Sequence, residues 1–377
     1  MMILIKNGEV YSPEYLGEKD LFICGNKIEY IGDKIQLQKE LPIKIIDAAN
    51  KLVFPGFIDS HVHILGGGGE GGFKTRTPEI SYKEIVRSGV TTVVGCLGTD
   101  GITRDMKGLL AKAKALEEEG ISTYIYTGSY KIPPKALMNS IEEDIMLIDK
   151  IIGVGEVALS DHRGSQPPIE KLIELASEAR RAGVLSNKAG IINIHLGDGK
   201  EKLDHLKRTV SETEIPITQF IPTHINRNEE LFKEGIEYAR SGGRIDLTTS
   251  TTTKFLMEGE VKCSRGLKRL LQSNVPIENI SFSSDAQGSL PMFNELGEFI
   301  GNGVGSISSL FKEVKDAILE ENIDIETAIK VITSNPASSL KLKGKGRIEE
   351  GKDGDIVILD KETLEITNVI AMGNIAI

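Results

Sequence analysis

The sequence contains few cysteines, and their spacing does not suggest a covalent framework. Its three cysteines, Cys24, Cys96 and Cys263, lie far apart, and no two of them have the CxxC spacing. An odd number of scattered cysteines gives no indication of a disulfide framework or of a thiolate metal site. We therefore expect a protein of the reducing cytoplasm.

Signals for a membrane or a nucleic acid are also missing. The first residues, MMILIKNGEV, are not a basic segment followed by a long apolar one, and no later run approaches about 18 apolar residues. The 377 residues include 55 acidic and 45 basic ones, which gives a net charge of -10. Because nucleic acids and anionic membranes bind clustered Lys and Arg, we expect no nucleic acid and no membrane as partner, but a small molecule.

The pattern of apolar residues divides the chain into two kinds of sequence. Residues 1–54 contain short β-rich runs between Gly, Asn and Asp turns, which is typical of a small antiparallel unit. From residue 57, apolar runs alternate with segments that can form helices, as in βα units around a parallel sheet. Eight such runs follow one another: GFIDSHVHI, VTTVVGCLGT, ISTYIYTGSY, IIGVGEVALS, IINIHLGD, QFIPTHIN, RIDLTTS and NISFSSDAQ. Eight units predict an α/β fold of the (β/α)8 TIM barrel class.

The helices and the chain ends complete the predicted architecture. Expected helices over 103–120 and 168–183 each end at a glycine placed like a C-cap, and residues 289–340 have enough helical pattern for an extra layer. Residues 346–377 are strand-rich again, so the chain ends as it begins. We predict a barrel over residues 55–343, beside a small β-sandwich domain that residues 1–54 and 344–377 form together.

Polar residues recur where the predicted barrel strands end, and active sites of such barrels lie at that end. These residues are His61 and His63 on the first strand, Glu156 on the fourth, His195 on the fifth, His224 on the sixth and Asp285 on the eighth. In HVH, the two-residue period of a strand directs both imidazoles to one side. Imidazoles and carboxylates suit Zn²⁺, and six ligands are too many for one tetrahedral centre. We therefore predict two divalent metal ions, with zinc as the expected metal.

A structural alternative is that these residues are ordinary polar groups of the barrel. An isolated HxH pair is more often hydrogen-bonded in a barrel than bound to a metal. Six converging residues, however, would leave buried charge poorly compensated without a cation, so we favour metal binding for the set. His162, in SDHRG, is a further candidate for orienting a ligand from outside the set.

Several strings resemble a known family. PGFIDSHVH, SSDAQGS and GRIEEGKDGDIVILD, with the two further strand-ending histidines, resemble the amidohydrolase superfamily, whose members combine this barrel with a split β domain. Within it, the sequence is similar to the isoaspartyl dipeptidases through HILGGGGEGGF, LGTDG, TGSYKIP, SDHRGSQP, THINRN and SDAQGSLP, in this order over nearly the whole chain. Hydantoinases and dihydroorotases share the HxH but not the glycine run with its glutamate or the TGSY segment.

One position departs from the family. Its members carry a lysine on the fourth strand, carboxylated by CO₂ to bridge both metals, where this chain has Glu156 in GVGEVALSDHR. A glutamate is shorter but presents the same singly negative pair of oxygens, so we expect it to bridge the metals without CO₂. The alternative is that Glu156 pairs with a nearby cation and that the site holds one metal.

The resemblance implies binuclear metal-dependent hydrolysis of the β-aspartyl (isoaspartyl) peptide bond in dipeptides. A hydroxide that bridges the metals would attack, and Asp285 would carry its proton to the leaving nitrogen as general acid and base. Tyr130 would donate a hydrogen bond to the developing oxyanion. The residues implied in substrate binding are Gly68, Gly69, Glu70, Thr99, Tyr130, Arg163, Arg227 and Ser289.

These substrate residues divide by charge. Glu70 would hold the α-ammonium of the substrate, and the glycines would let the backbone approach the ligand closely. Arg163 and Arg227 would hold carboxylates in bidentate fashion, with Ser289 and Thr99 adding hydrogen bonds. Taken alone, each arginine is more often part of a salt bridge at the rim.

Two other functions stay open at this point. A cyclic-amide hydrolase of the hydantoinase or dihydroorotase type shares the HxH. A non-catalytic barrel with an assembly role predicts the loss of metal ligands, whereas all six are present. The resemblance to an octameric family also implies a homo-oligomer.

Overall fold

Eight parallel strands form the barrel, and each carries one of the apolar runs of the sequence. The structure is a computed structural model and describes residues 1–36, 42–293 and 299–377. The barrel strands are β6 (Phe57–Val62), β7 (Val90–Gly95), β8 (Ser122–Thr127), β9 (Ile151–Leu159), β10 (Ile191–Leu196), β11 (Phe220–Thr223), β12 (Ile245–Thr248) and β13 (Ile280–Ser283). Nearly all of their residues are buried, as expected for parallel strands that are covered on both faces.

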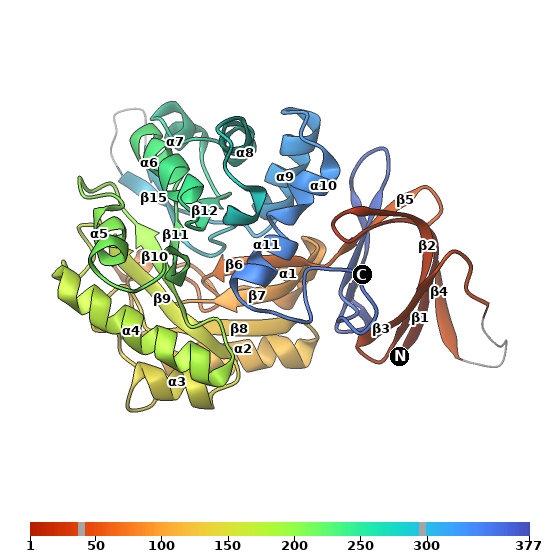
Figure 1. Cartoon of the computed structure of the whole chain (residues 1–377), viewed down its shortest axis with the longest axis horizontal. Coiled ribbons are helices and arrows are strands. Elements are labelled where there is room, and N and C mark those ends of the chain that lie inside the picture. The colour runs from red at the N-terminus through yellow and green to blue at the C-terminus, as the bar shows by residue number, and fades with distance from the viewer. Residues whose placement is uncertain (37–41, 294–298) are drawn as a thin grey trace.

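The strands close into a ring in chain order. Strands β6 to β11 pair side by side in one parallel sheet, and β12 pairs with β13. The backbone N–H of Ile225 donates to the carbonyl of Asp246 at 3.3 Å, which joins the end of β11 to β12. A parallel bridge between Val62 and Ala286 joins β6 to the segment after β13. The predicted (β/α)8 fold is confirmed (Figure 1).

Helices surround the barrel, and none in the described parts of the chain is long and apolar enough to cross a membrane. They are α1 (Tyr82–Arg87), α2 (Met106–Glu119), α3 (Ile141–Leu147), α4 (Ile169–Ser186), α5 (Asp204–Glu212), α6 (Glu229–Arg240), α7 (Thr253–Met257), α8 (Cys263–Gln272), α9 (Ser309–Leu319), α10 (Ile325–Lys330) and α11 (Ser334–Ser339), with the short 3₁₀ helices η1 (Phe73–Thr75), η2 (Ile217–Gln219) and η3 (Ile277–Asn279). Before α9, the described residues of the tract from 289 include two strands that pair antiparallel, β14 (Ser289–Phe293) and β15 (Phe299–Val304).

The two helix ends predicted at glycines differ in outcome. Helix α2 ends at Gly120, which adopts the left-handed conformation with φ 118°, as predicted. Helix α4 does not end at Gly183, so that prediction is wrong: it continues to Ser186 and is capped by Asn187 with φ 56°. A Cβ on Gly183 would lie 2.6 Å from the Cα of Gly190, so this glycine permits close packing instead of ending the helix.

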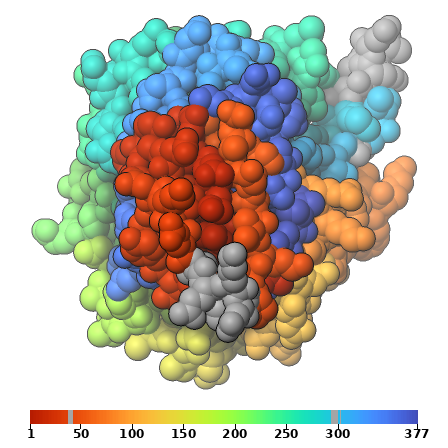
Figure 2. Space-filling model, turned by 90° about the vertical axis from the view of Figure 1, so that its right-hand side faces the viewer, coloured from red at the N-terminus to blue at the C-terminus, as the bar shows by residue number. Residues whose placement is uncertain are grey.

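Both ends of the chain build the small β domain, as predicted. Its strands are β1 (Met2–Tyr11), β2 (Tyr15–Cys24), β3 (Lys27–Gly32), β4 (Ile43–Asp47), β5 (Lys51–Pro55), β16 (Ile356–Asp360), β17 (Ile366–Ala371) and β18 (Asn374–Ile375). They belong to one sheet, in which β5 pairs with β16, and its buried side chains, such as Ile3, Ile23 and Ile356, pack in a core of their own. Figure 2 shows the N-terminal strands on this side of the molecule with C-terminal residues beside them. The domain boundaries stay a prediction.

Candidate active site

The six predicted metal ligands meet at the carboxyl end of the barrel, beside a cavity of about 770 Å³. Five of them line the cavity, namely His63, Glu156, His195, His224 and Asp285. His61 is fully buried. The rings of His61 and His63 lie 5.4 Å apart on the same side of their strand, which is the arrangement that the HVH period predicts. The fold therefore brings together residues that are up to 224 positions apart in the chain.

Glu156 lies between two groups of histidines. Its Oε2 atom is 3.4 Å from Nε2 of His61 and 3.6 Å from Nε2 of His63. Its Oε1 atom is 2.6 Å from Nδ1 of His195 and 3.3 Å from Nε2 of His224. Asp285 joins the first group, with Oδ1 3.0 Å from Nε2 of His63. Each group has the ligand types and the spacing of a metal site, and Glu156 is common to both.

Buried polar atoms at this site lack hydrogen bonds. Within the described chain, Nε2 of His61, Oε2 of Glu156 and Oδ1 of Asp285 have no hydrogen-bond partner, although all three atoms are buried. Such groups are costly to bury unless a partner or an ion compensates them. A divalent cation among them would satisfy all three, so the residues present fit a metal.

The electrostatics of the site also favour a cation. Burial raises the pKa of Glu156, but His61 and His195 overcome this effect and hold its pKa well below the usual range. Burial likewise opposes ionisation of Asp285, whereas His63 lowers its pKa to about 2. Burial and the neighbouring His195 lower the pKa of His224 to about 3, so this imidazole is neutral and can act as a ligand. In the metal-free site the positive charge beside these carboxylates is on His61 and His63, because Cys96 and the carboxylates hold the pKa of both imidazoles well above the usual range despite their burial. A divalent ion would take the place of their protons.

Two further side chains orient the histidines, and sequence reasoning missed both. Oδ2 of Asp161 lies 3.0 Å from Nε2 of His195, while Oγ1 of Thr248 lies 2.6 Å from Nδ1 of His224. Each contact is to the ring nitrogen that does not face Glu156, which is how proteins fix the tautomer of a ligating histidine. His162, our candidate for this role, is exposed. The only signal for Asp161 was its place beside that histidine, and Thr248 stands in a threonine run that β propensity explains.

Two of the predicted ligands have an unusual backbone. His224 and Asp285 adopt positive φ angles of 62° and 52°. Non-glycine residues in this left-handed region are uncommon and cluster at functional sites, where the surroundings hold them in place. The chain therefore turns sharply after β11 and β13, at the residues whose side chains face the cavity.

The glycine run after HVH folds tightly and presents Glu70 at the cavity. Gly68 has φ +70°, and a Cβ there would lie 2.6 Å from the carbonyl oxygen of Thr75, so no larger residue fits without a shift. Gly69, with φ +106°, is not among the residues that line the cavity. The carboxylate of Glu70 accepts hydrogen bonds from Thr99 at 2.9 Å and Ser289 at 3.3 Å. These two hydroxyls thus position Glu70.

Arg163 and Tyr130 both contact His195. Arg163 donates from Nε and Nη2 to the carboxylate of Asp161 at 2.9 and 2.6 Å, so its bidentate fork is occupied by this chain itself. Its Nη1 remains on the cavity side, 3.6 Å from Glu70. The hydroxyl of Tyr130 lies 3.0 Å from Nδ1 of His195, and burial raises its pKa well above the usual range, so it remains a donor.

Arg227 faces the cavity with spare donor capacity. Its Nε atom is buried without a hydrogen-bond partner among the described residues, and the nearest ion-pair contact is 3.9 Å away, at the exposed Asp198. A partly buried guanidinium that lacks a close carboxylate is suited to hold an anion from outside.

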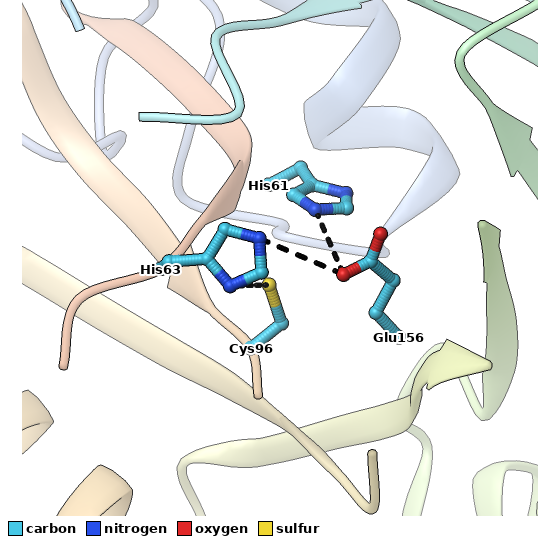
Figure 3. Close-up of side chains that lie close together, drawn as sticks. All are labelled: His61, His63, Cys96 and Glu156. Carbon is cyan, nitrogen blue, oxygen red and sulfur yellow. Dashed lines mark hydrogen bonds and ion pairs between the residues drawn. The ribbon is translucent and has the colours of Figure 1, made fainter. Parts of the chain in front are cut away.

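Cys96 also lies beside the candidate metal ligands, which the sequence did not indicate. Its Sγ atom is 3.7 Å from Nδ1 of His63, and Figure 3 shows it beside His61, His63 and Glu156. The cysteine signal in a sequence is its spacing to other cysteines, whereas here the partners are histidines of a neighbouring strand.

Comparison with known proteins agrees with this geometry. The profile of the Amidohydrolase family matches residues 52–376. A crystal structure of the beta-aspartyl dipeptidase from Fervidobacterium islandicum AW-1, in complex with a beta-Asp-Leu dipeptide, is 45% identical with a TM-score of 0.91, and covers 100% of this chain and 96% of that one. The resemblance to isoaspartyl dipeptidases is thus confirmed.

More distant relatives have other activities. The dihydroorotase of Aquifex aeolicus is 25% identical over 98% of this chain and 92% of its own length. The 5-methylthioadenosine/S-adenosylhomocysteine deaminase of Carboxydothermus hydrogenoformans is 25% identical over 96% of this chain and 84% of its own length. Since the family profile spans most of the chain, and since the barrel, its split β domain and the rim of histidines and carboxylates agree with it, this protein belongs to the amidohydrolase family.

Proposed function

We propose that this protein is a binuclear metallo-dipeptidase that hydrolyses the β-aspartyl bond of isoaspartyl dipeptides. The observation that carries the proposal is the position of Glu156, with one carboxylate oxygen toward His61 and His63 and the other toward His195 and His224. This arrangement supports two divalent ions with a shared carboxylate, and zinc suits the imidazole-rich donor set. When bound, the ions supply an activated water and polarise the scissile carbonyl.

The charges around the cavity match the free groups of such a substrate. In a β-aspartyl dipeptide the peptide bond uses the side-chain carboxyl, so the aspartyl α-ammonium and α-carboxylate both remain free. Glu70 offers an acceptor for the ammonium, and its own partners, Thr99 and Ser289, keep it in place. Nη1 of Arg163 and Nε of Arg227 are the donors left for carboxylates. An α-linked dipeptide would present these groups at other positions.

Two residues have proton roles in the proposal. Asp285, with its depressed pKa, is ionised and can accept a proton from the attacking water and return it to the leaving nitrogen. Tyr130, which stays protonated, can donate a hydrogen bond to the carbonyl oxygen as its negative charge develops. Both side chains line the same cavity as Glu70 and Arg227, so binding and proton transfer share one site.

The direct test is a substrate comparison with the purified holoenzyme. β-Asp-Leu, α-Asp-Leu, dihydroorotate, hydantoin and 5′-methylthioadenosine are assayed side by side. We expect β-Asp-Leu to be hydrolysed with a kcat/KM at least about 100-fold above that of α-Asp-Leu, since the wrong isomer would leave charged groups of the site and of the ligand without a partner. Turnover of the other compounds without β-Asp-Leu hydrolysis would contradict the proposal.

A cyclic-amide hydrolase is the second candidate. It is favoured by the 25% identity to a dihydroorotase over nearly the full length of both chains. Such substrates lack the α-ammonium, and Glu70 would then have no substrate partner. Replacing Glu70 by Gln separates the two functions, because the β-aspartyl activity should fall sharply whereas hydrolysis of a cyclic amide should be nearly unchanged.

A further inference from the structure

We propose that Cys96 supplies a thiolate ligand to the metal ion held by His61, His63 and Glu156. The inference rests on the metal site of the proposed function and adds a donor to it. It gives a role to a residue for which the sequence, with its scattered cysteines, indicated no metal binding.

Strand pairing brings Cys96 to the site. It directly follows β7, which lies beside β6 in the barrel, and its backbone N–H donates to the carbonyl of Val62 at 3.0 Å. Val62 is the residue between the two histidines of HVH, so the pairing places the Cys96 side chain next to both imidazoles. The side chain is 1% exposed, and Figure 3 shows it pointing toward the same space as His61 and Glu156.

The distances between donor atoms suit one tetrahedral ion. Zinc bonds of about 2.0 Å to nitrogen or oxygen and about 2.3 Å to sulfur place neighbouring donors roughly 3.3–3.5 Å apart. Nε2 of His61 and Oε2 of Glu156 are 3.4 Å apart. Sγ of Cys96 is 3.7 Å from Nδ1 of His63, whereas Nε2 of that ring faces Glu156 at 3.6 Å. Donor atoms of these four residues all lie within 4.8 Å of one another. Of these atoms, Nε2 of His61 and Oε2 of Glu156 are buried without a hydrogen-bond partner in the described chain.

Cys263 shows what a structural thiol looks like in the same barrel. It is also buried, but its Sγ donates to the carbonyl of Thr248 at 3.0 Å. The corresponding contact of Cys96, to the carbonyl of Val62, is longer, at 3.7 Å. Cys24 is exposed on the small β domain. Cys96 is therefore distinguished from the other two thiols by its histidine and carboxylate neighbours.

A thiolate ligand has a consequence for metal choice. Together with Glu156 it makes the donor set softer and more negative than imidazoles and carboxylates alone. The site formed by His61, His63, Cys96 and Glu156 should then retain zinc or cadmium in preference to magnesium or manganese, which favour oxygen donors.

The test is X-ray absorption spectroscopy of the zinc-loaded holoenzyme at the zinc edge. We expect a zinc–sulfur scattering path near about 2.3 Å that corresponds to about one sulfur per two zinc ions. Cys263→Ser, the matched control, should keep this path, and Cys96→Ser should lose it together with at least about tenfold in zinc affinity. A wild-type spectrum with nitrogen and oxygen scatterers only would overturn the proposal and leave Cys96 as a hydrogen-bond partner of His63.

A second measurement covers the case in which Cys96→Ser does not fold. The cobalt-substituted wild-type protein should show a near-ultraviolet thiolate-to-metal charge-transfer band, which Cys263→Ser retains, and its absence would overturn the proposal. Activity toward β-Asp-Leu is recorded on the same preparations. Active enzyme without metal–sulfur contact contradicts only the role of Cys96, whereas a metal–sulfur contact in protein without this activity supports Cys96 and contradicts the dipeptidase.

Discussion

The two ends of the barrel both bury charged side chains, but they satisfy them in opposite ways. At the amino end, the ammonium group of Lys345 contacts the carboxylates of Asp353 and Asp355 and donates to Ser122, the first residue of β8. At the carboxyl end, buried atoms of His61, Glu156 and Asp285 have no hydrogen-bond partner in the described chain. Buried charged groups whose partners all belong to the chain stabilise the contact between the two parts of the fold. Buried polar atoms that lack such a partner indicate a site for a ligand.

The charged groups at the amino end contribute to stability, whereas those at the carboxyl end belong to the candidate active site. Lys345 connects the start of a barrel strand to the segment that leads into β16, so its cluster holds the barrel against the small β domain. Glu156 connects two pairs of histidines: its Oε1 contacts His195 and His224, and its Oε2 is buried without a hydrogen-bond partner in the described chain. We therefore expect changes at the amino end to lower the free energy of unfolding, and changes at the carboxyl end to remove metal and activity.

The largest effect is expected for Glu156→Ala. Loss of the shared carboxylate should release metal and lower kcat/KM for β-Asp-Leu by at least about 1,000-fold, because charge stabilisation at the reacting centre is lost. Metal content and steady-state kinetics measure this. Added bicarbonate should not stimulate the unmodified enzyme. Strong bicarbonate dependence would show that a carboxylated lysine supplies the bridge and that Glu156 has another role.

Lys345→Met should have the next largest effect, on stability. It leaves Asp353 and Asp355 without their buried cation, and breaking a buried pair in this way costs about 3–5 kcal/mol of unfolding free energy. Urea unfolding gives the free energy, and kcat/KM of the folded protein should stay within about twofold of wild type. In metal-free protein, Glu156→Ala should cost less than Lys345→Met. A larger loss of unfolding free energy in Glu156→Ala than in Lys345→Met would contradict the difference between the two ends of the barrel.

A smaller effect is expected for Thr248→Val, which removes the oxygen that contacts Nδ1 of His224. Losing such an orienting contact typically lowers metal affinity about 10–100-fold. Competition with a chelator measures the affinity. Thr249→Val is the matched control, because Thr249 is also buried at the end of β12 but bonds to Ser283 and Ser309. Equal effects of both substitutions would mean that Thr248 acts through packing.

The smallest effect concerns pH and the amino end. Burial raises the pKa of Asp353, but the neighbouring cations Lys345 and Lys27 lower it by more than burial raises it. The pKa of Asp353 in the folded state is therefore below the unfolded value of about 3.9. Its contribution to stability is then complete above about pH 4 and is lost as the pH falls through the folded pKa. Unfolding free energies between about pH 5 and 3 should decline less steeply in Lys345→Met than in wild type. Equal slopes of unfolding free energy against pH in both proteins would show that the contact between Lys345 and Asp353 does not contribute to the pH dependence.

The eight barrel strands and the convergence of six histidine and carboxylate side chains could be predicted from sequence for a simple physical reason. Parallel barrel strands are apolar runs, and the residue at the end of each run faces the active site, so His195 or Asp285 can be found without knowing what surrounds it. Asp161, Thr248 and Cys96 could not be found in this way, because each acts on a histidine of another strand and is defined only by how strands pair. For the same reason the sequence does not show that the guanidinium of Arg163 already donates two hydrogen bonds to Asp161.

In the proposed function, Glu156 lies between two metal ions. An anomalous-difference map from crystals of the zinc-loaded protein, recorded at the zinc edge, tests it directly. We predict two peaks in each chain, one next to His61 and His63 and the other next to His195 and His224, with one oxygen of Glu156 bound to each. A single peak, or two peaks of which Glu156 contacts only one, would contradict the account.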